Sequence, residues 1–170
     1  EMQRLEPIVK PEFGILTHMG EAHGKNFESD EEKLREKLQL FRHTKHLIYR
    51  ASSNTIPIVS EEIKKINPNC ELISWSTTDP NQSIFVYWKI QGKISQLKFQ
   101  KRNQSEAFLS VQCQLHDEAS LENLTHCLIQ AHLLGLTQEE INQAIPGIKS
   151  ISMRLEIKEG LRNNQLIDDS

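Results

Sequence analysis

The first half of the chain alternates short apolar runs with amphipathic stretches. The run Phe13–Thr17 ends in a turn-rich loop, as a buried parallel strand does. Ser29 and Glu32 form a capping box, which starts a helix whose apolar positions recur at spacings of four and three. The pattern predicts a strand at 13–17, a helix at about 30–41, a strand at 46–50, a short helix at 60–67 beginning near Ser60, and a strand at 71–76. This alternation of strands and helices favours a parallel sheet with helices on its faces.

The second half begins with three β-rich runs and no helix between them, which predicts an antiparallel meander at one edge of the sheet. Two helices follow, the first ended by Gly135 and the second opened by a capping box of Thr137 and Glu140. The expected elements are strands at 83–91, 93–100 and 107–114, a helix at 120–134, a helix ending at Pro146-Gly147, and a hairpin of 153–158 with 165–167.

The predicted fold is therefore α/β, with a mostly parallel sheet flanked by helices and an added antiparallel three-strand meander. The opening of the last hairpin places a domain boundary near Ser150, so that 1–150 is one domain and 151–170 is the start of another.

Composition narrows the class of protein. The net charge of −3 over 170 residues offers no basic field for nucleic acid. No apolar run approaches the roughly 20 residues of a membrane span, so no membrane insertion is expected. Three widely spaced cysteines, with no C-x-x-C pair, indicate reduced thiols in a cytoplasmic protein.

The loop after Thr17 carries the first candidate chemistry: His18, Glu21 and His23. Ligands of open α/β sheets bind at the carboxyl ends of the strands, and imidazoles with carboxylates suit Mg²⁺ or Mn²⁺ when phosphate oxygens complete the shell. Ordinary solvated loop residues are the commoner interpretation. Lys37 lies on a charged helix. For this lysine, too, the commoner interpretation is an ordinary side chain on the solvated face of the helix.

Three separated segments resemble the central domain of the Mur ligase superfamily. They are Glu1-Met2 with Leu5 and Ile8, then Gly14-Ile-Leu-Thr-x-x-Gly-x-Ala-His23 with Phe27, and Lys37-Leu-x-Leu-Phe41. The resemblance implies that Glu1, His23 and a carbamylated Lys37 bind metal. His18 stands where the family usually has Asn, and imidazole is bulkier and titrates.

The resemblance continues along the second half and implies nucleotide contacts. Asn123 matches a family position near the adenine, although Ala119 and Ser120 replace the first two members of that His-Asn-x-x-Asn segment. A helix-start residue that satisfies backbone N–H groups is the alternative for Asn123. Arg154 matches an arginine that reaches toward the phosphates, and Asp169 an aspartate at the ATP ribose.

The resemblance is greatest to the ligases that add D-alanyl-D-alanine to UDP-N-acetylmuramoyl-tripeptide, including forms fused to an alanine racemase. It implies a cytoplasmic enzyme of cell wall synthesis that uses ATP and Mg²⁺ and proceeds through an acyl phosphate. The phosphate-binding pattern G-x-x-x-x-G-K-[ST] occurs nowhere in the 170 residues, and the first residue is not Met. We therefore expect a fragment of the central domain that is inactive by itself.

Three alternatives remain at this point. One is another amide ligase of the superfamily, such as an amino-acid-adding Mur ligase or folylpolyglutamate synthase. The second is a non-catalytic binding module that retains the scaffold. The third is a small metallohydrolase that uses His18, Glu21 and His23, whose H-x-x-E-x-H spacing differs from the helical H-E-x-x-H of zinc proteases.

Overall fold

The structure is a computed structural model that describes residues 2–17, 27, 29–148, 156–159 and 165–168. Its first half contains α1 (Met2–Val9), β1 (Phe13–Leu16), α2 (Asp30–Leu38), η2 (Gln39–Phe41), β2 (His46–Arg50), α3 (Thr55–Ile66) and β3 (Glu71–Ser76). The second half contains β4 (Ile84–Gln91), β5 (Ile94–Lys101), β6 (Ala107–Cys113), α4 (Glu118–Leu133), α5 (Gln138–Ala144) and η3 (Ile145–Gly147). β7 (Glu156–Glu159) and β8 (Gln165–Asp168) form an antiparallel pair, as the hairpin pattern predicted.

The first six strands form one sheet in the order β1-β2-β3-β4-β5-β6. β1 to β4 are parallel, and β4, β5 and β6 are antiparallel, which confirms the predicted fold class. β3 and β4 share only two residue pairs, Trp75 with Ile84 and Ser76 with Phe85. Because this overlap is so small, the chain joins two parallel strands without a crossover helix, which parallel strands ordinarily need.

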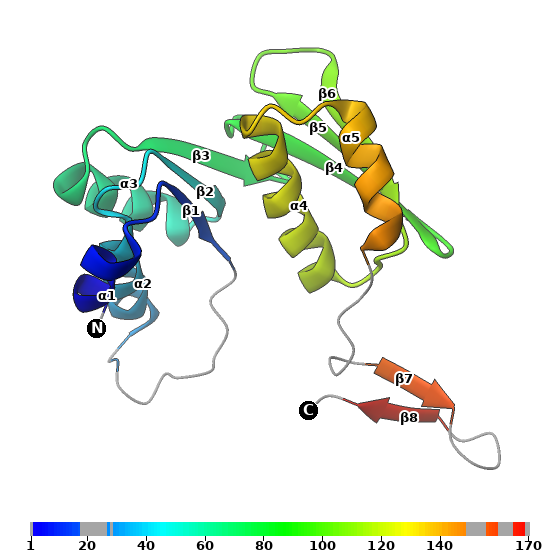
Figure 1. Ribbon diagram of the computed structural model, residues 1–170, viewed down its shortest axis with the longest axis horizontal. Coiled ribbons are helices and arrows are strands. Elements are labelled where there is room, and N and C mark those ends of the chain that lie inside the picture. The colour runs from blue at the N-terminus through cyan, green and yellow to red at the C-terminus, as the bar shows by residue number, and fades with distance from the viewer. Residues whose placement is uncertain (1, 18–26, 28, 149–155, 160–164, 169–170) are drawn as a thin grey trace.

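Helices cover both faces of the sheet, so there are two hydrophobic cores (Figure 1). Successive residues of β2 point to opposite faces. Leu47 and Tyr49 pack with side chains of α2 and α3, whereas Ile48 joins the core beneath α4 and α5. This explains why the three central residues of β2 are all buried instead of alternating between buried and exposed.

At the start of α2, the Ser29 hydroxyl accepts a hydrogen bond from the Glu32 backbone N–H (3.1 Å), which is one of the two bonds of the predicted capping box. At the start of α5, Thr137 with Glu140 forms a complete capping box, as predicted. Gly135, with φ of 85°, follows the end of α4 in the left-handed conformation that glycine adopts readily.

Two predicted helix starts were wrong, and one helix was not predicted. α3 begins at Thr55 and not near Ser60, because Ser52 and Thr55 bond reciprocally at its start and Pro57 falls in the first turn, where N–H groups lack helical partners. α4 begins at Glu118, where Asp117 accepts from the Ser120 N–H (2.8 Å). Helix α1 was not predicted; it has only eight residues and contains Pro7, and proline in a helix interior is normally a helix-breaking signal.

Candidate functional site at the carboxyl edge of the sheet

The carboxyl ends of β1, β2 and β3 open onto a cleft of about 940 Å³. Its walls come from α2 and from the start of α3, and its floor from the strand ends. The polar residues that line it include Thr17, Arg35, Arg50, Ser52, Ser76 and Glu122. This is the edge at which open α/β sheets bind ligands.

Arg50, the last residue of β2, is fixed at this edge by acidic and aromatic neighbours. Its Nη1 lies 2.7 Å from the Glu122 carboxylate and 2.8 Å from that of Glu118. Its guanidinium lies 5.6 Å from the ring centres of both Trp75 and Trp88. Planar guanidinium groups bind carboxylates and stack on aromatic rings in this way, so Arg50 joins β2 to α4.

Glu122 is the buried member of this network, with a side chain that is 5% exposed. Burial alone would raise its pKa, but the cationic Arg50 and the imidazole of His126, 3.9 Å away, outweigh this effect and lower the pKa. The carboxylate is therefore ionised at neutral pH and holds Arg50 in place.

Trp75 and Trp88 both find hydrogen-bond acceptors on α4. Trp75 Nε1 donates to His126 Nδ1 (3.3 Å), and Trp88 Nε1 donates to the Thr125 hydroxyl (3.3 Å). Because Nδ1 of His126 accepts, a neutral His126 carries its proton on Nε2, the nitrogen that lies nearest Glu122. Sequence reasoning missed this network, although Glu118, Glu122 and His126 recur at the i, i+4 spacing that marks one helix face.

A second arginine, Arg35 of α2, ties the two helices that form one wall of the cleft. It contacts Glu62 (2.8 Å) and Glu61 (3.4 Å) of α3, as well as Glu31 (2.9 Å) one turn earlier. Hydrogen bonds to Glu31 and Glu62 raise its pKa, so it is always cationic.

The predicted site residues are not brought together within the described part of the chain. Lys37 is half-buried in the last turn of α2 and is not among the described residues that line the cleft. Asn123 is exposed in the second turn of α4. The alternative interpretation, that Asn123 caps the start of this helix, was therefore wrong, because Asp117 is the capping residue. Glu1, His18, Glu21, His23, Arg154 and Asp169 lie outside the described residues.

A protein metal site needs several donor side chains close together. Within residues 2–17, 27, 29–148, 156–159 and 165–168, no three His, Cys, Asp or Glu side chains converge to hold an ion. A lysine ammonium offers no lone pair to Mg²⁺, so Lys37 would have to be carbamylated to act as a ligand. Among the described helices, none is long and apolar enough to cross a bilayer.

Solved structures with this fold include several amide ligases. MurF from Acinetobacter baumannii has a TM-score of 0.75 at 18% identity, over 100% of this chain and 36% of that one. The apo form of FPGS from L. casei scores 0.65 at 14% identity, over 86% and 35%. MurC from Thermotoga maritima scores 0.66 at 13% identity, over 94% and 34%. The chain thus spans little more than a third of these proteins.

Sequence comparison identifies the family. Comparison with curated proteins gave no match. The family model described as the Mur ligase middle domain matches residues 1–131, which is most of the chain. The chain therefore belongs to the Mur ligase middle-domain family.

Proposed function

We propose that this chain is part of an ATP-dependent ligase that joins D-alanyl-D-alanine to UDP-N-acetylmuramoyl-tripeptide through an acyl phosphate. The observation that carries the proposal is the likeness to MurF structures over 100% of the chain, together with the family match. One of those proteins is the UDP-N-acetylmuramoylalanyl-D-glutamyl-2,6-diaminopimelate–D-alanyl-D-alanyl ligase of Acinetobacter baumannii. In this proposal the enzyme is cytoplasmic and residues 1–150 and 151–170 belong to two of its domains.

The proposed ligand roles follow the family positions. Glu1, His23 and carbamylated Lys37 hold Mg²⁺, and Asn123, Arg154 and Asp169 contact ATP. Bound metal would neutralise charge on the transferring phosphoryl group. The described residues contribute an ordered cleft: the Arg50–Glu122 pair fixes the end of β2, and the Arg35 contacts fix α2 against α3. A preformed cleft of this kind places reactants without reorganising the scaffold.

The proposal also names the amine substrate, D-alanyl-D-alanine, and this part of it depends on the likeness to MurF in particular. MurC and FPGS share the fold at TM-scores close to that of MurF, so the fold does not distinguish the amines that the members use. Fusion to an alanine racemase is part of the same proposal, because the sequence resemblance includes such forms.

The test is phosphate release by the natural full-length protein in the presence of ATP and UDP-N-acetylmuramoyl-tripeptide. We expect turnover that requires D-alanyl-D-alanine, and no turnover from the 170-residue chain alone. Turnover with a single amino acid or a folate substrate would assign another ligase of the superfamily. Complete absence of ATP-dependent turnover with every substrate would favour a non-catalytic module.

Lys37→Ala in the full-length protein tests the metal site in the same assay. We expect a loss of at least about 100-fold in kcat, as for removal of a group that stabilises developing charge. Lys64→Ala, an exposed lysine on α3, is the matched control and should leave kcat unchanged. An unchanged rate in Lys37→Ala would remove Lys37 from the proposed ligand set.

A further inference from the structure

The antiparallel meander differs in charge from the rest of the chain. The stretch 80–105, which contains β4, β5 and the turn between them, holds four lysines and one arginine but no aspartate or glutamate. The whole chain nevertheless has a net charge of −3, so the residues outside this stretch are strongly acidic. A protein with its charges separated in this way approaches an anionic surface with its basic side first.

One face of the β4–β5 hairpin has no cover. Val86 and Leu97 point to the face that packs under α4 and α5 (Figure 1). The opposite face presents Tyr87 beside its cross-strand partner Lys98, and Lys89 two residues further along β4, and all three are exposed. Among the described residues, neither core includes a side chain from this face of β4 and β5. An open face is common in antiparallel sheets, and the distinguishing feature of this hairpin is its tip.

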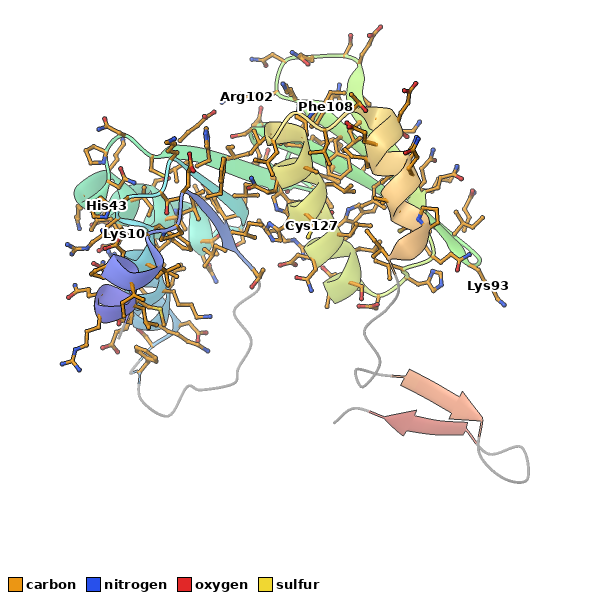
Figure 2. The ribbon with its side chains drawn as sticks, in the orientation of Figure 1. Lys10, His43, Lys93, Arg102, Phe108 and Cys127 are labelled. Carbon is orange, nitrogen blue, oxygen red and sulfur yellow. The ribbon has the colours of Figure 1, made fainter. Side chains whose placement is uncertain are left out.

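The tip of the hairpin is apolar and projects from the sheet. β4 pairs with β3 only through its first two residues, so the rest of β4 extends past the end of β3. Ile90 and Ile94 are 52% and 51% exposed and flank the turn at Gly92 and Lys93. They belong to neighbouring rungs of the ladder, so their side chains point to opposite faces of the hairpin. Figure 2 shows Lys93 at the outer end of the hairpin. The tip is therefore a wedge with an aliphatic side chain on each face.

We infer that this hairpin docks the protein reversibly on an anionic lipid bilayer. The two isoleucines enter the boundary between headgroups and acyl chains, and the lysines beside them hold lipid phosphates while their methylene stems lie on the apolar layer. Tyr87 suits the same depth, because its ring is apolar and its hydroxyl is polar. Cytoplasmic leaflets carry the negative charge that such a surface requires. The docking surface consists of Tyr87, Lys89, Ile90, Lys93, Ile94 and Lys98.

The shape of the tip favours a bilayer over an acidic protein as the occupant. Because Ile90 and Ile94 lie on opposite faces, a single flat protein surface covers only one of them. A fluid interface surrounds a projecting wedge and covers both. β4 runs parallel to β3, so the tip projects at the end of the sheet where the cleft opens. Docking therefore turns the cleft end of the sheet toward the membrane surface.

Vesicle binding tests the inference without ATP or ligase substrates, so its outcome does not depend on the proposed function. The natural full-length protein and the 170-residue chain are sedimented with vesicles of phosphatidylcholine alone, or of phosphatidylcholine and phosphatidylglycerol at about 2:1. We expect both proteins to bind the mixed vesicles only, and to be released as NaCl rises from about 0.05 M to about 0.5 M. Ile90→Ser with Ile94→Ser should weaken binding at least about tenfold, because two apolar side chains no longer enter the interface. Lys89→Gln with Lys98→Gln should also weaken it at least about tenfold, through the lost attraction to phosphates.

Matched variants elsewhere on the surface are the controls. Ile8→Ser with Leu134→Ser removes aliphatic side chains that are 80% and 58% exposed, and Lys10→Gln with Lys64→Gln removes two exposed lysines outside the meander. Both should bind as wild type does. Equal losses in hairpin and control variants would overturn the inference, because binding would then not be local to the hairpin. Absence of binding by the full-length protein would also overturn it, even if the short chain binds, because the rest of the polypeptide would then cover the hairpin. Self-association that the hairpin variants abolish, without vesicle binding, would assign the surface to a second copy instead.

Discussion

At the scale of single residues, Gly14 shows why the Gly-Ile-Leu-Thr segment begins with glycine. A Cβ at this position would lie 2.7 and 2.8 Å from two ring carbons of Phe41, and 3.0 Å from a methyl of Leu47. Phe41 is buried in the core between the sheet and α2, so it has little room to move. The glycine is required by the close approach of η2 to β1 and not by its backbone conformation.

Gly14→Ala should therefore lower the free energy of unfolding by about 1–3 kcal/mol, the usual cost of overpacking a core. Gly147→Ala is the matched control, because a Cβ there has nothing within 4 Å, and should change stability by less than about 1 kcal/mol. Urea denaturation of both variants measures the difference. Equal stability of the two variants would show that Phe41 moves aside easily.

The buried carboxylate of Glu122 predicts a pH dependence. Its pKa in the folded protein lies below the usual 4.5, so the ionised group stabilises the fold above that pH and loses its contribution as the pH falls through the lowered pKa. At pH 7, Glu122→Gln should cost about 1–3 kcal/mol, because Arg50 loses its buried partner. The gap between wild type and variant should stay constant down to about pH 5 and close below it.

Glu118→Gln is the control for Glu122→Gln, because it removes an exposed carboxylate that contacts the same arginine. Glu118 contacts the same Nη1 of Arg50, but its side chain is 69% exposed. Exposed ion pairs contribute under about 1 kcal/mol, so this variant should be nearly as stable as wild type at every pH. Equal losses in the two variants would mean that burial of Glu122 has no energetic consequence.

At the scale of elements, α5 depends on its amino-terminal cap because it has only seven residues. The Glu140 backbone N–H donates to the Thr137 hydroxyl (3.2 Å), and the Thr137 N–H donates to the Glu140 carboxylate (2.8 Å). These two bonds satisfy backbone donors that the first helical turn otherwise leaves without partners.

Thr137→Ala should cost about 1 kcal/mol of stability, the typical value for a lost cap. Because the two bonds are reciprocal, Thr137→Ala combined with Glu140→Ala should cost less than the sum of the single variants, which a double-mutant cycle by urea denaturation measures. Gln143→Ala, an exposed position in the same helix, is the control and should be neutral. Strict additivity would contradict the reciprocal cap.

At the scale of the whole molecule, the sheet separates two hydrophobic cores, and β2 contributes side chains to both. One lies between the sheet and α2 and α3, and the other between the sheet and α4 and α5. The first supports the cleft wall built around Arg35, and the second supports Arg50 through Trp75 and α4. The cleft therefore forms only when both faces of the sheet are covered.

The whole chain should nevertheless bind ATP poorly by itself. Backbone N–H groups of a Gly-rich loop at a helix start hold nucleotide phosphates in such enzymes, and these 170 residues do not contain that pattern. Isothermal titration of the isolated chain with Mg²⁺ and ATP should therefore show no saturation in the micromolar range, about −8 kcal/mol. Saturable micromolar binding would require a phosphate site of another kind.

The amino-acid sequence by itself determined the order of the strands and of the helices after β1, and several of the helix caps. These features follow from local periodicity and from hydrogen bonds between residues three positions apart, such as Ser29 with Glu32 and Thr137 with Glu140. The family could also be recognised from the segments around Gly14 and Lys37, because they lie in order within a single stretch of chain.

Only the tertiary structure decided what joins distant elements. The Arg50–Glu122 bond spans 72 positions and the Trp75–His126 bond spans 51, and no local pattern encodes such pairs. The tertiary structure likewise decided that α1 turns its polar face inward, because the partners of Gln3 and Glu6 come from η2 and the turn after it. Periodicity states which residues share a face of a helix, but the neighbouring elements decide which face is buried.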